Sequence, residues 1–330
     1  MTRLWVPALL LCSALPAQNN DATFRVGVSL VHVDVEVTDA QGKVIHGLTR
    51  NDFRVFDQNH PEPIVQFSEG EEALDLILLF DVSGSMKPKV AEVAAAAKQG
   101  ISMLRPGDRV AVMVFNTRSQ VLAPFTEDLE AVEQTVRKDV MRLPFDGGTF
   151  IQNAVDDAAL KLMHEPRTNR RRAVLIITDN LGQRTRREKT VVRDFWEADA
   201  ILSALIVRSP LATAGLILSP EMLALTVGVK GITDKTGGDF IHSRDSGAAF
   251  EDAMHRIRVR YSLYYDLPPA NPGHHRNIRV ELTADAASRY PKAHVHARTG
   301  YVVPDTENQG EVESATLPGR RARRPAPLNP

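Results

Sequence analysis

Asp81, Ser83 and Ser85 carry oxygen donors at alternate positions directly after an apolar run, residues 74–80. A strand that is buried on both faces has such a continuous apolar sequence, and ligand sites of open α/β sheets form at the carboxyl ends of the strands. One carboxylate and two hydroxyls are hard ligands, which suit Mg²⁺ or Mn²⁺ better than zinc or copper. Because turns also favour Asp and Ser, the prediction of a metal site depends on further ligands from elsewhere in the chain.

Two other segments could complete an oxygen site. Residues 146–149 (Asp-Gly-Gly-Thr) form a glycine loop before a predicted helix, so the Thr149 hydroxyl lies at a helix N-terminus. A second apolar strand, residues 174–178, ends at Asp179, and in a doubly wound sheet it neighbours the first strand, which brings Asp179 beside Asp81. The convergence of three motifs on one edge favours a metal site over the alternative that the two carboxylates only cap helices and turns. The predicted ligands are Asp81, Ser83, Ser85, Thr149 and Asp179.

Strands and helices alternate over residues 74–257, which is typical of a parallel sheet with helices on both faces. The predicted strands are 74–80, 109–115, 173–178 and 201–207, with weaker ones at 120–123 and 239–241. Helices are predicted between the first strand and Pro106, at 128–141, from Thr149 onward, at 220–235 and at 246–257.

Residues 24–70 and 258–303 alternate apolar and polar side chains, as strands do. Neither segment is large enough to close a core, so we expect them to pair. The predicted fold is an α/β unit with a doubly wound, mainly parallel sheet, 74–257, inserted in a β-sandwich-like domain built from the N- and C-terminal strands. Residues 304–330 are rich in proline and poor in apolar side chains, which predicts a disordered tail.

The composition bounds the class of protein. The chain has 330 residues, enough for about two domains at the usual 100–200 residues each. Its 43% hydrophobic and 25% charged residues are ordinary for a globular protein with a core. A formal net charge of -1 supplies no global field that would attract nucleic acid, so we expect no nucleic-acid partner.

The N-terminus has the pattern of an export signal. Arg3 provides a positive start, residues 4–15 form an apolar stretch, and Ala17 offers a small residue for cleavage. We therefore expect residues 1–17 to be a signal peptide and the protein to be periplasmic, cell-surface or secreted. This stretch is too short for a membrane span, and no later segment is long and apolar enough to be a transmembrane segment.

Cys12 is the only cysteine and lies in the predicted signal. A lipid-anchored form would use it, but the bulky Leu11 before it disfavours that alternative. The mature protein would then lack thiols, which excludes catalytic cysteine, thiolate zinc and disulfides.

Together, Asp-x-Ser-x-Ser after a strand, a Gly-Gly-Thr loop and Thr-Asp after a later strand resemble the von Willebrand factor A family, over about 180 residues. The flanking segments resemble bacterial exported proteins related to it, through residues 37–42, Gly47-Leu48-Thr49 with Asp52-Phe53, and residues 297–301.

The resemblance implies a metal-ion-dependent adhesion site. It implies that the hydroxyls of Ser83, Ser85 and Thr149 bind the ion directly, and that Asp81 and Asp179 act through water and hydrogen bonds. The cation would be Mg²⁺ in the first instance, with Mn²⁺ and Ca²⁺ left open, and a protein partner would offer an Asp or Glu as the remaining ligand. Asn180 departs from the family, where glycine is common, and this concerns the loop more than the metal.

Other polar clusters have two interpretations. The side chains of Arg184, Arg186, Arg187 and Lys189 could form a basic rim that attracts an acidic partner, or an ordinary solvated helix start. Arg170, Arg171 and Arg172 precede a strand, lie at the opposite end of the sheet and are assigned no role. His274, His275, His294 and His296 are expected to be solvated rather than to bind a transition metal, because no cysteine or suitably spaced carboxylate accompanies them.

The favoured function is an exported protein-binding module. No Gly-x-Ser-x-Gly motif, phosphate-binding loop or dinucleotide fingerprint is present, so we expect no enzyme. Two alternatives remain: a metal-dependent hydrolase that uses the same site, and a structural envelope protein in which the site is vestigial.

Overall fold

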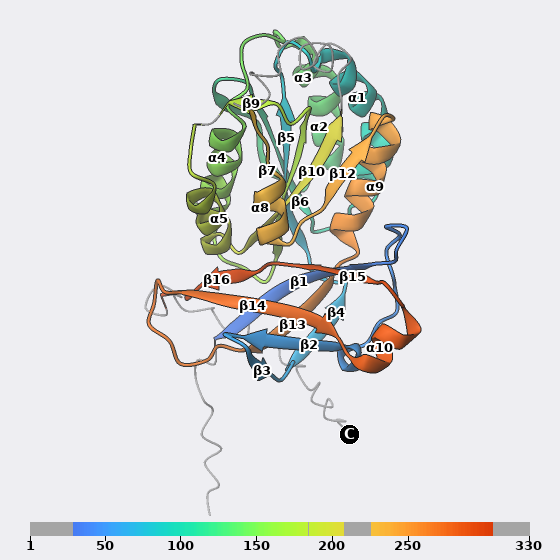
Figure 1. The fold of residues 1–330 in the computed structure, drawn as a ribbon. Helices are drawn as coiled ribbons and strands as arrows, with labels where there is room; N and C mark the ends of the chain where they lie inside the picture. The colour runs from blue at the N-terminus through green and yellow to red at the C-terminus, as the bar shows by residue number, and fades with distance from the viewer. Residues whose placement is uncertain (1–28, 184, 208–225, 306–330) are drawn as a thin grey trace, which may run out of the picture.

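A computed structural model describes residues 29–183, 185–207 and 226–305 (Figure 1). A sheet flanked by helices stands on a sandwich of antiparallel strands, and the two units are joined by chain at both ends of the α/β unit. The predicted signal, Arg184 and almost all of the predicted tail lie outside the described residues. Of the helices in the described ranges, none is long and apolar enough to cross a membrane.

The central sheet has six strands in the order β12-β10-β8-β5-β6-β7. All neighbours are parallel except β6 and β7, which are antiparallel. The strands β5, β8 and β10 are buried along their whole lengths, which explains their continuous apolar sequences. The bounds are β5 (Leu74–Asp81), β6 (Arg109–Phe115), β7 (Ser119–Thr126), β8 (Arg171–Thr178), β10 (Ala200–Val207) and β12 (Phe240–Ser243).

Helices cover both faces of this sheet. Even-numbered apolar residues of β5 pack with α1 (Lys87–Ile101), α2 (Leu129–Gln134) and α9 (Ser246–Arg258). Odd-numbered ones pack with α4 (Ile151–Met163), α5 (Glu188–Glu197) and α8 (Lys230–Thr236). The predicted doubly wound fold class is confirmed.

The sandwich has two four-stranded antiparallel sheets, β15-β1-β13-β4 and β16-β14-β2-β3. β1 pairs along its length with β13, so strands on either side of the α/β unit in sequence lie side by side. The bounds are β1 (Leu30–Thr38), β2 (Phe53–Asp57), β3 (His60–Glu62), β4 (Gln66–Glu69), β13 (Tyr261–Asp266), β14 (His275–Leu282), β15 (His294–Ala297) and β16 (Gly300–Val302). Two short helical segments, η1 (Arg50–Asp52) and α10 (Ala284–Arg289), connect these strands.

Two predicted helices differ in detail. The helix expected at 128–141 is divided by a π-helical turn, η2 (Thr135–Asp139), before α3 (Val140–Arg142). The helix expected at 220–235 begins only at Lys230, because Thr226–Val227 form strand β11, which pairs with β9 (Gly182–Gln183); residues 220–225 lie outside the description. Strands of two residues are too short for periodicity to reveal.

The two units meet across a layer of buried charges. Valines at the odd positions of residues 31–37 pack in the sandwich core, and the alternate side chains of His32, Asp34 and Glu36 contact the α/β unit. His32 Nδ1 lies 3.8 Å from Asp199 Oδ2, and Asp34 Oδ1 lies 3.5 Å from both His32 Nε2 and Arg171 Nε. Burial alone would lower the pKa of His32, but Asp34 and Asp199 reverse this and raise it to about 9.

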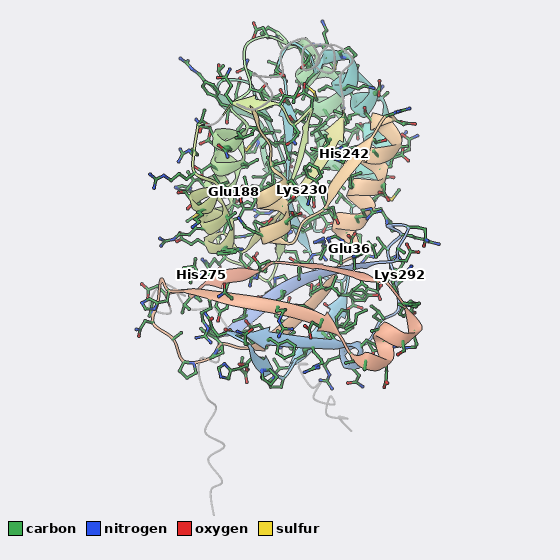
Figure 2. All side chains as sticks on the ribbon, in the orientation of Figure 1. Glu36, Glu188, Lys230, His242, His275 and Lys292 are labelled. Atoms are coloured by element: carbon green, nitrogen blue, oxygen red, sulfur yellow. The ribbon has the colours of Figure 1, made fainter. Side chains whose placement is uncertain are left out.

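Glu36 is a further buried carboxyl at this junction (Figure 2). Burial raises the pKa of Glu36 well above its ordinary value, and the nearby carboxylate of Asp239 adds to this effect. The pKa of Asp239 is lowered in spite of burial, chiefly by Arg260, whose Nη2 lies 3.3 Å from Asp239 Oδ2. Arg256 approaches Glu36 Oε1 at 3.6 Å. This environment therefore favours the protonated form of Glu36 and the ionised form of Asp239.

We predict that E36Q stabilises the protein at alkaline pH. Because the folded-state pKa of Glu36 is raised, the folded chain keeps a proton that the unfolded chain loses, so stability falls as pH rises above the ordinary value of 4.5. Glutamine cannot lose a proton, so denaturant unfolding at pH 8 should show the variant more stable by at least about 1 kcal/mol, as one pKa unit corresponds to about 1.4 kcal/mol. The matched control is E71Q at an exposed position, and equal stability of E36Q and the parent from pH 5 to 9 would contradict this account.

Candidate metal centre

The parallel pairing of β5 with β8 aligns the ends of both strands. Phe80 pairs with Ile177 in the register, so Asp81 and Thr178 come next at the carboxyl edge, which points away from the sandwich (Figure 1). Thr178 Oγ1 donates a hydrogen bond of 2.7 Å to Asp81 Oδ2. The other oxygen, Asp81 Oδ1, accepts a hydrogen bond of 2.9 Å from the backbone N–H of Ser83. Both carboxylate oxygens of Asp81 are thus held in place.

The structure also joins Ser85 to Asp179. Ser85 Oγ donates to Asp179 Oδ2 at 2.7 Å, and the backbone N–H of Leu181 donates to Asp179 Oδ1 at 3.2 Å. The Ser83 hydroxyl is buried and makes no hydrogen bond with any residue of the described ranges. An unpaired buried hydroxyl is costly, so Ser83 Oγ is a donor that a bound ion could use.

Thr149 is buried in a loop that is fixed to the same edge of the sheet. Asp146 N donates to Val82 O at 3.2 Å, Phe150 N donates to Asn116 O at 2.9 Å, and Thr149 O accepts from Gln183 N at 2.9 Å. The left-handed φ of +75° at Gly147 lets the loop turn there. These bonds tie the loop to the ends of β5 and β6 and to the short strand β9.

The electrostatics of the site favour a cation. Burial raises the pKa of Asp81 to about 6, and the nearby charge of Asp179 adds to this effect, against the hydrogen bonds from the Ser83 backbone N–H and the Thr178 hydroxyl. Burial likewise raises the pKa of Asp179. Within the described part of the chain, neither carboxylate forms an ion pair with a lysine or arginine. Two carboxylates and three hydroxyls are a donor set that suits a hard divalent cation.

Histidine and cysteine do not enter this site. In the described ranges no three His, Cys, Asp or Glu side chains are grouped so that they could hold a metal ion. His275 is stacked on Trp196, with ring centroids 4.6 Å apart, and His294 and His296 are exposed on β15.

One residue of the predicted basic rim, Arg186, forms an ion pair that the sequence did not predict. Arg186 Nη1 lies 2.7 Å from Oδ2 of the buried Asp156 on α4. Gln152 Oε1, also on α4, accepts from the backbone N–H groups of Thr185 and Arg186 at 3.4 and 3.3 Å. Arg186 therefore anchors the loop after the site, while Arg187 and Lys189 begin α5 at exposed positions.

Asn180 serves the site as a structural residue. Its φ of +64° lies in the left-handed region, which asparagine tolerates better than most residues. Asn180 Oδ1 accepts a hydrogen bond of 2.9 Å from the backbone N–H of Val229. A Cβ on Gly228 would lie 2.3 Å from the Asn180 amide nitrogen, so a larger residue there would displace the Asn180 side chain. Asparagine thus replaces the flexibility of glycine with a fixed link between two loops.

Known proteins provide an independent comparison. The family model for the von Willebrand factor type A domain matches residues 76–183. No curated protein matches the chain.

Among solved structures, the chain is similar to an aerotolerance-related membrane protein from Bacteroides fragilis, with 15% identity over 56% of this chain and 98% of that chain, and a TM-score of 0.42. It is similar to BatB from Bacteroides thetaiotaomicron, with 17% identity, coverage of 56% and 97%, and a TM-score of 0.42. A von Willebrand factor type A protein from Catenulispora acidiphila shares 12% identity over 78% of this chain and 74% of that chain, with a TM-score of 0.44.

We predict that N180A lowers the free energy of unfolding by about 1–2 kcal/mol, since alanine is strained in the left-handed region and the bond to Val229 is lost. N180G should cost less, because glycine adopts this φ freely. Urea unfolding measures both, and an equal loss in the two variants would show that backbone strain contributes nothing.

Proposed function

We propose, from the match of residues 76–183 to the family model for the von Willebrand factor type A domain, that this domain captures an acidic residue of a partner protein through a bound divalent cation, most simply Mg²⁺. The ligand set is Asp81, Ser83, Ser85, Thr149 and Asp179. The observation that carries the proposal is the buried Ser83 hydroxyl, which has no hydrogen-bond partner among the described residues, while the backbone N–H of the same residue binds the buried carboxylate of Asp81.

The hydroxyl and carboxylate side chains of the site have different proposed roles. The hydroxyls of Ser83, Ser85 and Thr149 would bind the ion, and Asp81 and Asp179 would hold its water ligands. When bound, the ion supplies a positive centre that attracts an anionic ligand from outside the protein. Thr178 keeps the carboxylate of Asp81 oriented through the bond of 2.7 Å, so the site is pre-organised before any partner arrives.

The activity proposed for this site is binding of a partner protein rather than catalysis. Within the described residues, the Ser83 backbone N–H donates to Asp81 and the Ser85 hydroxyl donates to Asp179, and no hydrogen bond links either serine to a histidine base. Turnover of generic ester or phosphate substrates by the Mg²⁺-loaded protein would support the hydrolase alternative instead.

The proposal also includes export of the protein from the cytoplasm. Residues 1–17 would be removed, and the mature protein would act in the periplasm, at the cell surface or after secretion. Sequencing of the N-terminus of protein recovered from cell fractions tests this directly, because uncleaved protein confined to the cytoplasm would contradict export.

We predict that Mg²⁺ stabilises the parent protein and not S83A. Saturation at about 100 times the dissociation constant should add about 2.7 kcal/mol to the free energy of unfolding. Removal of an unpaired buried hydroxyl should leave the metal-free protein as stable as the parent or more so. Thermal unfolding with Mg²⁺ and with chelator measures both effects.

An S83A protein that is stabilised by Mg²⁺ as strongly as the parent would exclude the Ser83 hydroxyl as a ligand. A strongly destabilised S83A protein in chelator would show that the hydroxyl has a structural partner instead.

We further predict that chelator and D81N each abolish capture of the partner from envelope extract. Asparagine keeps the shape of Asp81 and removes its charge, so the fold should persist, as circular dichroism can check. D285A, at an exposed position in the sandwich, is the matched control and should retain capture. Capture that survives both chelator and D81N would refute the proposed mechanism.

A further inference from the structure

A cavity of about 310 Å³ lies beside the metal site, between the turn that joins β6 to β7 and the start of α4. Phe150, Asn153 and Asp157 line it from the side of α4, and Asn116 and Arg118 line it from the turn. The loop that carries the predicted ligand Thr149 also contributes to the cavity. Phe150 follows the predicted ligand Thr149, and its backbone N–H donates to Asn116 O at 2.9 Å.

The wall formed by α4 presents hydrogen-bond acceptors without partners. Asn153 and Asp157 are four residues apart, so they share one face of α4, and Phe150 is the residue directly before the helix. Asn153 Oδ1 is buried and accepts no hydrogen bond from the described residues. Asp157 forms no hydrogen bond or ion pair in the same ranges, because Lys161, one turn further, binds Glu165 at 2.6 Å instead.

The opposite wall carries a single cation. Arg118 is exposed on the turn, and its guanidinium forms no ion pair with Asp157 or with any other carboxylate in the ranges that the structure covers. Its backbone is fixed through the bond between Arg118 N and Asn116 Oδ1, at 3.3 Å. The acceptors of α4 are therefore available to a donor from outside, and Arg118 is the cation that would compete with it.

We infer that this cavity binds a basic side chain, arginine or lysine, of the same partner segment that supplies the acidic residue to the metal. A guanidinium or ammonium group would donate to Asn153 Oδ1 and Asp157, and the ring of Phe150 offers a face for a cation. Because the cavity residue Phe150 directly follows the predicted ligand Thr149, the basic residue would lie near the acidic one in the partner segment. The link to the acidic residue rests on the proposed function, but the cation preference of the cavity does not.

The cavity is tested first without metal. We titrate the protein, in chelator, with N-acetylargininamide and follow backbone and side-chain amide signals by NMR. Saturable shifts are expected at residues 116–119, 150, 153 and 157, and N-acetylglutaminamide, which is uncharged, should produce at least tenfold weaker binding. D157N should weaken argininamide binding at least fivefold, and R118A should strengthen it. Equal binding of the two probes, or an unchanged affinity in D157N, would overturn the inference.

The link between the two sites is tested with peptides. Glycine-flanked peptides that contain one aspartate and one arginine, separated by one to three positions, are compared with peptides in which glutamine replaces the arginine. In Mg²⁺, at least one spacing should bind about tenfold tighter with arginine, and D157N should remove this advantage while Mg²⁺ dependence persists.

The two proposals fail in different ways. Peptide binding that is independent of Mg²⁺, with argininamide still bound at the cavity, would refute the metal-dependent function alone. Mg²⁺-dependent binding with no preference for arginine at any spacing would refute the inference alone.

Discussion

The parallel register of β5 against β8 is the constraint on which the site depends. It places Asp81 opposite Thr178 and brings the following Asp179 within hydrogen-bond distance of Ser85. Both strands are buried on both faces, so a slip of the register would move a whole set of apolar side chains as well as the site residues. The energy of the core therefore secures the geometry of two carboxylates that would otherwise repel each other.

At the opposite end of the sheet, buried charges join the sandwich to the α/β unit. His32, Asp34 and Glu36 of the sandwich contact arginines and carboxylates from distant parts of the chain. Removing one partner from such a buried network leaves an uncompensated charge, which is more costly than the pair is stabilising. This explains why the unit inserted in the sandwich is held in one orientation, with its site at the far end (Figure 1).

The sequence predicted the features that leave a local pattern of apolar residues. Four of the strands of the central sheet could be predicted from their apolar runs, because burial on both faces leaves a continuous apolar sequence, as in β5 and β8. The sequence could not predict the charged contacts between the sandwich and the α/β unit, because Arg171 and Glu36 are each far in sequence from the residues that they contact. Arg171 was assigned no role, yet it is buried and donates to the carbonyl oxygens of Ile257 and Arg260. Charged residues at alternate positions of β1 were the one available signal.

The central claim is that five side chains at one edge of the sheet form a divalent-cation site. The most direct test is a crystal soaked in Mn²⁺, with data collected so that the anomalous scattering of manganese locates the ion. A single anomalous peak within coordination distance of the hydroxyls of Ser83, Ser85 and Thr149 is the predicted result. A fully soaked crystal with no peak at this position, or with manganese bound elsewhere only, would contradict the account.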